Sequence, residues 1–484
     1  MTTIKLDPGA ALLLDALHGA GHAAYAVGGC VRDSLLGLAP HDWDLCTSAR
    51  PEQVMALFGE EKCIPTGLQH GTVTVKQGGR LYETTTFRTE GAYSDGRHPD
   101  AVCFVPDVRE DLARRDFTIN AMAYSAEEGL IDPFGGRDDL AAHLVRAVGE
   151  PERRFEEDAL RILRLYRFAA RFGFAIDPAT GAAARALGPH LDCVSAERIQ
   201  EELLKLLAAP RPGIYLEPAV LAVVLPELEP EKQPEQFAEL CRTIDRIEPT
   251  AENVPARLAA LLCPLGEAGA RKALRKLKCS NALTDEVTAL EREAGGGAGS
   301  FLLGHEFELR HPADALCLER HSHPAGRCPN SNSLFPPQAA VVTVAGHSIA
   351  RPIACGNRVP PPRTVLGETP GTPNTTLTVQ AKRLLGRYEL PTIQRLTALC
   401  SARHPEQTGA FAALRAEAEQ LTAENACCRV SQLAVNGRDL MAAGVRPGPG
   451  LRQVLNALLE AVITGQTPNE KDALLAAAAQ FSAS

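Results

Sequence analysis

A short stretch near the amino terminus, "AYAVGGCVRDSLLGLAPHDWDLCTSA" (residues 24–49), holds residues whose types and spacing suit chemistry. Its second half contains Asp42 and Asp44, separated by Trp43. The segment "WDLCTSA" predicts a strand, and side chains alternate along a strand, so both carboxylates are expected on one face. Two converging carboxylates repel each other unless a cation lies between them, and hard oxygen ligands suit Mg²⁺. The sequence therefore predicts a magnesium site at Asp42 and Asp44.

Paired glycines precede the aspartates, at a predicted turn between the strand "AYAVGG" and the helix "VRDSLLG". At Gly28 and Gly29 backbone N–H groups can approach a phosphate, and the N-terminus of the following helix favours an anion. Arg32, one turn into that helix, adds a charged donor for phosphate oxygens. Together with the metal pair, these residues predict a site for a metal-bound triphosphate, at which a hydroxyl is activated and a leaving pyrophosphate is stabilised.

Each of these signals alone has a simpler explanation. A Gly-Gly pair is usually a turn, and an Asp-X-Asp usually belongs to a loop or a cap. Their occurrence close together, in a strand–turn–helix and then strand setting, favours a nucleotidyltransferase.

The motif "GGCVRD…DWD" resembles the catalytic signature of the class II tRNA nucleotidyltransferases, the family of CCA-adding enzymes and poly(A) polymerases. The stretches "RHPDAVCFVPDVREDLARRDFTINAMAY", "DPFGGRDDL", "RRFEEDALRILRLYRFAARFGF" and "SAERIQEELLKLL" follow in the family's order, and "LAVNGRDLMAAGVRPGPG" resembles its C-terminal segment. The resemblance implies template-independent addition of CCA to the 3′ end of tRNA, from CTP and ATP, with release of pyrophosphate. It covers most of the chain except residues 300–376.

The surrounding elements predict an α+β fold. The first part of the chain alternates strands and helices, and "GTVTVKQGGRLYETTTFR" is typical of a hairpin that turns at Gly78 and Gly79. Later segments have apolar residues at three- and four-residue spacing, which is typical of amphipathic helices. With the resemblance, this predicts a polymerase-β-like head with a mixed sheet, followed by an all-α neck, body and tail. The expected boundaries are 1–140 for the head, 141–208 for the neck, 209–300 and 377–484 for the body and tail, and 301–376 for an insertion.

A base-selecting pair is predicted on the helix "EEDALRILRLYR". Asp158 and Arg161 are three residues apart, so they are expected on one helix face. An aspartate accepts from the exocyclic amino group of cytosine or adenine while an arginine donates to the adjacent ring nitrogen. Guanine and uracil present the reverse order, so the pair would admit CTP and ATP only. The resemblance assigns this templating role to the matching residues.

Further arginines continue this helix at Arg164 and Arg167. Such a row is usually a solvated face with salt bridges, but acidic residues lie only at its N-terminal end, which favours anion binding here. The resemblance places these arginines around the nucleotide and gives Arg115 a nucleotide contact. Asp116 is expected to meet the ribose or to cap a helix, and Glu83 is either a third metal carboxylate or part of a cross-strand pair.

The interval from about residue 312 to 376 is rich in proline and shows no period, which is typical of a disordered insertion. A frame-shifted stretch would have the same texture. Its "CLERHSHPAGRC" has a zinc-like spacing, but chance composition explains it better. Some family members carry a metal-phosphohydrolase domain; here Cys263 and Pro264 occupy the corresponding place, so phosphatase activity is not expected.

The composition argues against several other classes of protein. The 484 residues carry a net charge of −9, so tRNA must bind a local basic surface rather than the whole chain. There is no apolar run long enough for a membrane span and no secretory signal at "MTTIKLDPGAALLLDALHGAG". Fourteen cysteines without a C-x-x-C pair favour reduced thiols and a cytoplasmic location. We expect tRNA, CTP and ATP as the partners, and no membrane or protein partner.

Two other functions fit parts of the sequence. A poly(A) polymerase or an A-adding-only tRNA nucleotidyltransferase would share the catalytic residues, although the loop "FRTEGAYSDGRHPDA" argues against a CC-only enzyme. A non-catalytic tRNA-binding protein would have lost the metal carboxylates, and both are present.

Overall fold

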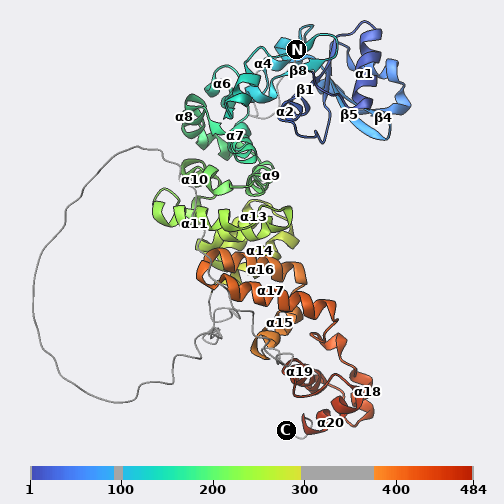
Figure 1. Cartoon of the computed structure of the whole chain (residues 1–484), viewed down its shortest axis with the longest axis vertical. Coiled ribbons are helices and arrows are strands. Elements are labelled where there is room, and N and C mark those ends of the chain that lie inside the picture. Colours follow the sequence, from blue (N-terminus) through green and yellow to red (C-terminus); the bar gives the residue numbers. More distant parts are fainter. Residues whose placement is uncertain (1–2, 92–101, 296–374, 482–484) are drawn as a thin grey trace, which may run out of the picture.

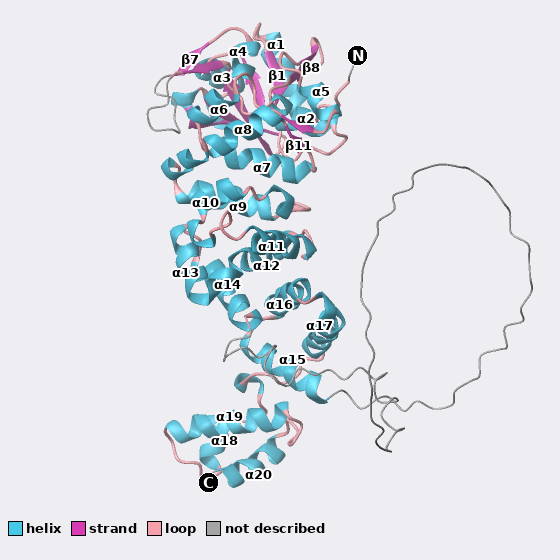
Figure 2. Ribbon diagram, turned by 90° about the vertical axis from the view of Figure 1, so that its left-hand side faces the viewer, coloured by secondary structure: helices cyan, strands magenta, loops and turns pink. Residues whose placement is uncertain are grey.

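The computed structural model describes residues 3–91, 102–295 and 375–481. The described parts form an elongated molecule, with a mixed α/β head at one end and the last three helices at the other (Figures 1 and 2). Part of the loop, residues 92–101, the zinc-like cluster of Cys317, His321, His323 and Cys328, and nearly all of the predicted insertion lie outside the described residues.

A mixed sheet forms the centre of the head. Within the described residues it has seven strands in the order β3-β4-β5-β2-β1-β8-β9. The β2–β5 pair is parallel and the other neighbours are antiparallel, so the predicted α+β class is confirmed. The strands are β1 (Ala24–Val27), β2 (Leu45–Thr47), β3 (Cys63–Gly67), β4 (Thr72–Gln77), β5 (Arg80–Thr86), β8 (Ala123–Ser125) and β9 (Gly129–Ile131).

Two further small sheets accompany the head and its junction with the neck. They comprise β6 (Arg88–Glu90) with β7 (Val102–Phe104), and β10 (Leu144–Val145) with β11 (Ala175–Ile176). The head helices are α1 (Pro8–Gly19), α2 (Gly29–Leu35), α3 (Pro51–Phe58), α4 (Val108–Ala113) and α5 (Gly136–Ala141).

The predicted hairpin is confirmed. Strands β4 and β5 pair from Thr72–Thr85 to Gln77–Arg80, leaving two residues at the turn. Gly78 and Gly79 there have φ values of 57° and 77°. A two-residue turn with positive φ at both positions fits the right-handed twist of the strands, and glycine adopts it at little cost.

Helices stacked along the long axis make the rest of the described part of the chain (Figure 2). Those next to the head are α6 (Pro151–Glu157), α7 (Leu160–Phe172), α8 (Pro178–Ala186) and α9 (Ala196–Leu207). The next are α10 (Pro218–Val224), α11 (Pro234–Arg246), α12 (Val254–Leu262), α13 (Gly266–Lys276), α14 (Asn281–Ala294), α15 (Thr375–Arg387), α16 (Leu390–Arg403) and α17 (Thr408–Ala423).

One hydrophobic core runs from the head through α7 and α9 to α17, because each helix buries an apolar stripe against its neighbours. The last helices, α18 (Gly437–Ala442), α19 (Pro449–Ile463) and α20 (Lys471–Phe481), pack around a separate apolar cluster. Among the described helices, none has the length and hydropathy that crossing a lipid bilayer requires.

Candidate active site

A cavity of about 750 Å³ lies where the head meets α7. Its lining residues come from α2, from the segment before β2 and from α7, so it joins the head to the neck. It brings together every residue that the sequence predicted for the site: Gly28, Gly29, Arg32, Asp42, Asp44, Arg115, Asp158, Arg161, Arg164 and Arg167.

The glycine turn has a backbone that only glycine adopts easily. Gly28 has φ 77° and ψ −123°, and its N–H donates to the carbonyl of Met122 at 3.0 Å. A Cβ on Gly28 would lie 2.8 Å from Nη1 of Arg115. The turn therefore needs glycine both for its conformation and for the close approach of this guanidinium.

Arg32 is buried within the site, with an exposed fraction of 3%. Its Nε donates to Asp33 at 2.8 Å, and its Nη1 donates to Asn120. The guanidinium also lies over the rings of Phe168 and Phe172. The predicted phosphate donor is thus held rigidly by polar and aromatic neighbours while still lining the cavity.

The strand predicted for the two aspartates is wrong in extent. Strand β2 begins at Leu45, so Asp42 and Asp44 lie in the segment that leads into it. Both nevertheless line the cavity and both are exposed, and Asp42 accepts a hydrogen bond from His41 at 3.0 Å. The carbonyl of Asp44 still accepts from the N–H of Val27 in β1 at 3.0 Å, so the chain joins the sheet at Asp44 while the regular strand begins one residue later.

Neighbouring negative charges act on Asp44. Desolvation by the surrounding groups raises the pKa of Asp44, the charges of Glu83 and Asp42 raise it further, and the charge of Arg115 opposes them. A divalent cation would relieve this repulsion, which is the behaviour expected of metal carboxylates. In the part of the chain that the structure describes, no group of three acidic, histidine or cysteine side chains lies close enough together to hold a metal ion.

The helix predicted for the base-selecting pair is interrupted. Asp158 lies between α6 and α7 with extended dihedrals, φ −149° and ψ 103°, so the prediction that it sits on a helix face is wrong. Its Oδ1 accepts from the N–H of Leu160 at 3.1 Å, and its Oδ2 accepts from Arg198 at 2.7 Å. This side-chain bond to the first residue of α7 stabilises the break.

Arg161 is held separately from Asp158. Its guanidinium donates to Glu157 at 2.6 Å, and to the carbonyls of Arg154 at 3.2 Å and Arg114 at 3.1 Å. The two members of the pair thus lie in the same cavity, each fixed by a different partner.

The later arginines of α7 have partners far away in the sequence. Arg164 donates to Asp116, and Arg167 donates to Glu202 of α9. Arg32, Arg164 and Arg167 all lie over the ring of Phe168, at 5.3, 5.3 and 4.0 Å from its centroid. As expected, the acidic partners of these arginines do not lie on the same helix. They come instead from residues distant in the sequence, Asp116 and Glu202.

Arg115 combines one ion pair with one unsatisfied group. Its Nη2 contacts Asp111 at 3.3 Å, whereas its buried Nε has no hydrogen-bond partner among the described residues. A buried donor without a partner is costly, and a phosphate or ribose oxygen would satisfy it.

Sequence reasoning missed several residues of the cavity. They are Arg114, Asn120, Phe168, Arg171, Arg198 and Lys205. Arg198 and Lys205 fall in the stretch "SAERIQEELLKLL", whose cationic spacing was the available signal. Among the described lining residues there are nine lysines and arginines against four aspartates, so a locally basic cavity lies in a chain of net charge −9.

Comparison with known proteins finds related sequences and folds. The "Poly A polymerase head domain" matches residues 24–146, the "Probable RNA and SrmB-binding site of polymerase A" matches residues 173–231, and "tRNA nucleotidyltransferase domain 2" matches residues 388–478. The CCA-adding enzyme of Lactiplantibacillus plantarum is 33% identical over 466 residues, which cover 96% of this chain and 93% of the relative.

Other alignments are closer in identity but shorter. The CCA-adding enzyme of Lactobacillus helveticus is 43% identical over 57% of this chain and 68% of its own length, and some relatives align over as little as 48% of theirs. Among solved structures, the Bacillus stearothermophilus CCA-adding enzyme in complex with CTP matches with a TM-score of 0.70 and 29% identity, covering 98% of both chains.

Proposed function

This chain belongs to the family of CCA-adding enzymes, and we propose from this premise how its cavity extends a tRNA. It is a nucleotidyltransferase that adds CCA to the 3′ end of tRNA from CTP and ATP, without a nucleic-acid template and with release of pyrophosphate. One observation supports the assignment of residues: a single cavity is lined by Asp42 and Asp44, by the Gly28 turn, and by Asp158 and Arg161.

Asp42 and Asp44 are the groups that would hold a divalent ion, which we propose to be Mg²⁺. Their oxygens are hard ligands, and negative neighbours that raise the pKa of Asp44 make a cation favourable there. Bound at this place, the ion would supply Lewis-acid chemistry to a phosphoryl group and a hydroxyl.

The cationic side chains would bind the triphosphate. Arg32, Arg115 and Arg164 reach the cavity from the head and the neck, and their own contacts hold them in place before the substrate arrives. Fixed positive charge stabilises the charge that develops when the 3′-hydroxyl attacks the α-phosphorus and pyrophosphate leaves.

Asp158 and Arg161 would select the base. Asp158 accepts two hydrogen bonds, and a carboxylate has room for about four, so it can also accept from the amino group of cytosine or adenine. Arg161 makes three hydrogen bonds and has five N–H donors, so it can also donate to the ring nitrogen. Because Arg198 and Glu157 fix the pair, the pocket discriminates without a template strand.

Incubation of the full chain with a tRNA transcript that ends before CCA tests this function. With CTP alone we expect two added nucleotides, with ATP alone none, and with both three, as sized on a sequencing gel. Long tails from ATP would instead identify a poly(A) polymerase. Extension only of a transcript that already ends in CC would identify an A-adding enzyme.

We also propose that the protein works in the cytoplasm. The eleven cysteines within the described residues are all free thiols, which agrees with a reducing compartment. The tRNA partner would reach the cavity through its basic lining.

A further inference from the structure

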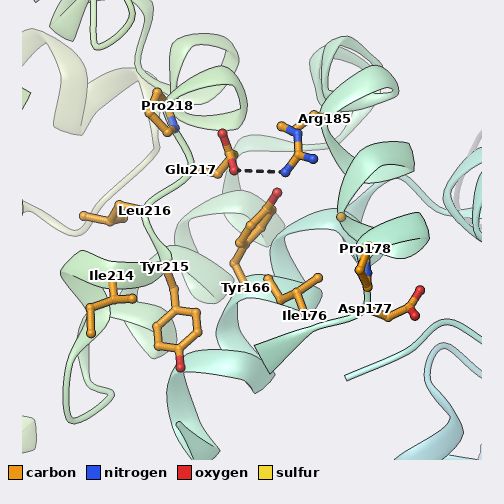
Figure 3. A pocket seen from close by; sticks show the side chains of 11 residues that line it. Tyr166, Ile176, Asp177, Pro178, Arg185, Ile214, Tyr215, Leu216, Glu217 and Pro218 are labelled. Carbon is orange, nitrogen blue, oxygen red and sulfur yellow. Dashed lines mark ion pairs between the residues drawn. The ribbon is translucent and has the colours of Figure 1, made fainter. Parts of the chain in front are cut away.

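A second cavity, of about 230 Å³, lies on the other side of α7. It is bounded by α7, α8 and η5 (Pro212–Tyr215), and it shares no lining residue with the catalytic cavity. Tyr166 of α7 lines this cavity. It comes two residues after Arg164, which corresponds to a rotation of about 200° around the helix axis, so the two side chains point to opposite sides of α7. This cavity is shown in Figure 3.

The hydroxyl of Tyr166 is a buried polar group without a partner. The residue is only 4% exposed, and its Oη makes no hydrogen bond within the described residues. The hydroxyl points toward Arg185 and Glu217 (Figure 3). Buried polar groups are nearly always satisfied by protein or by water, and a ligand in the cavity with a hydrogen-bonding group would satisfy this one.

Arg185 and Glu217 form an ion pair that is too long for a hydrogen bond (Figure 3). Nη1 of Arg185 lies 3.6 Å from Oε2 of Glu217, beyond hydrogen-bond distance. Both therefore keep donors and acceptors for a ligand. The carboxylate of the other charged lining residue, Asp177, already accepts hydrogen bonds from Thr180 and Arg146.

We propose that this cavity binds a nucleobase. Every base presents an N–H donor beside an acceptor on one planar edge, so Glu217 can accept from it while Arg185 donates to it. The Tyr166 hydroxyl makes a third hydrogen bond, and the side chains of Ile176 and Tyr215 cover apolar ring faces.

The volume and the charge of this cavity fit a nucleobase alone rather than a whole nucleotide. The volume is below the roughly 300–1,000 Å³ of typical drug-sized sites. Arg185 is the single cationic side chain among the described lining residues, whereas the catalytic cavity has nine. One guanidinium is too little positive charge to bind a triphosphate here. The sugar and phosphates would remain in solvent, and ATP should bind no more tightly than adenosine.

Photolabelling of the full chain with 8-azidoadenosine, in EDTA, tests the proposal. We expect a labelled peptide that contains Tyr166 or Tyr215, and protection by adenosine but not by caffeine, a purine without an N–H donor. Glu217→Ala and Arg185→Ala should each lower labelling roughly tenfold. Arg211→Gln, which removes an exposed guanidinium outside the cavity, should change it less than about twofold.

Tyr166→Phe separates binding from folding. It should weaken labelling while leaving the thermal midpoint unchanged or higher, because it deletes an unsatisfied buried hydroxyl. A tRNA transcript with 8-azidoadenosine in place of adenosine shows whether the base comes from RNA or from a free nucleoside. Cross-linking of the transcript to the same peptide identifies a base of the RNA. Labelling by the nucleoside but not by the transcript identifies a free nucleoside. Labelling unaffected by Glu217→Ala, protection by leucine instead of adenosine, or no label from either probe would overturn the proposal.

Discussion

Arg164 of the neck donates two hydrogen bonds to one carboxylate oxygen of Asp116 in the head, from Nε at 3.0 Å and from Nη2 at 2.7 Å. The other oxygen of Asp116 accepts from Asn120 and from the N–H of Phe117. Asp116 is 8% exposed. This contact joins the two parts of the molecule inside the catalytic cavity, and it accounts for Asp116 without requiring a helix cap.

The Asp116 carboxylate should stabilise the fold at neutral pH. Burial raises its pKa, but the charge of Arg164 and the hydrogen bond from Asn120 lower it to about 2, below the ordinary 3.8. A depressed pKa stabilises the fold above about pH 4, by about 2 kcal/mol here, and this contribution disappears as the pH falls toward 2. We therefore expect Asp116→Asn to lower the urea midpoint at pH 7 and to lose less stability than the unaltered chain between pH 5 and pH 3.

Asp192→Asn, at an exposed position, is the matched control, and it should follow the unaltered chain at each pH. Equal pH dependence in Asp116→Asn and the unaltered chain would contradict the role of this ion pair.

Asp42→Ala and Asp44→Ala should each abolish nucleotide incorporation. Loss of a carboxylate that holds the metal removes several kcal/mol of transition-state stabilisation, which corresponds to roughly a thousandfold in rate. Binding of tRNA, measured by filter retention, should remain. Asp15→Ala, on an exposed part of α1, should keep full activity. Incorporation above a few per cent in either active-site variant would reject the metal assignment.

Local patterns predicted what local interactions decide. The Gly78–Gly79 hairpin and the glycine turn at Gly28 require backbone conformations that few other residues adopt, so their sequence signals are direct. The break before α7 is different. "EEDALRIL" contains no glycine or proline, and the break depends on the Asp158 side chain and on Arg198, which lies 40 residues further along the chain.

The contact between Asp116 and Arg164 also spans 48 residues, and no spacing rule connects positions so far apart. The sequence therefore predicted which residues meet in the cavity but not which partners hold them. Nothing in the sequence predicted the cavity beside Tyr166, because an aromatic residue at this spacing is typical of the buried face of any amphipathic helix.

Arg161→Ala should relax the choice of nucleotide. Without its guanidinium, the ring nitrogen of cytosine loses its donor, and UTP no longer meets an unfavourable donor pair. We expect the ratio of kcat/KM for CTP to that for UTP to fall roughly ten- to a hundredfold. Single-nucleotide extension of the tRNA transcript with each triphosphate measures this ratio. An unchanged ratio would argue against the base-selecting pair.

Arg198→Ala should act through Asp158. It removes the guanidinium that donates to Asp158 Oδ2 at 2.7 Å, so the carboxylate loses its fixed position. We expect a roughly tenfold lower kcat/KM for CTP together with a smaller preference for CTP over UTP. Lys205→Ala is the control, because Lys205 also lines the cavity but pairs with Glu201. Its effect should be the same for every triphosphate, and a similar uniform loss in Arg198→Ala would contradict the positioning role.

Gly28→Ala should damage nucleotide binding more than folding. The new Cβ would lie 2.8 Å from Nη1 of Arg115, and the positive φ of 77° strains any side chain. The backbone strain costs about 1–3 kcal/mol, and the movement of Arg115 adds a loss at the triphosphate. Gly37→Ala supplies the comparison, since Gly37 has a φ of 73° but nothing within 4 Å of its Cβ position. Both variants should melt at lower temperature, whereas only Gly28→Ala should raise the KM for CTP, by roughly tenfold. Equal KM values in the two variants would mean that the contact between this turn and Arg115 does not serve the nucleotide.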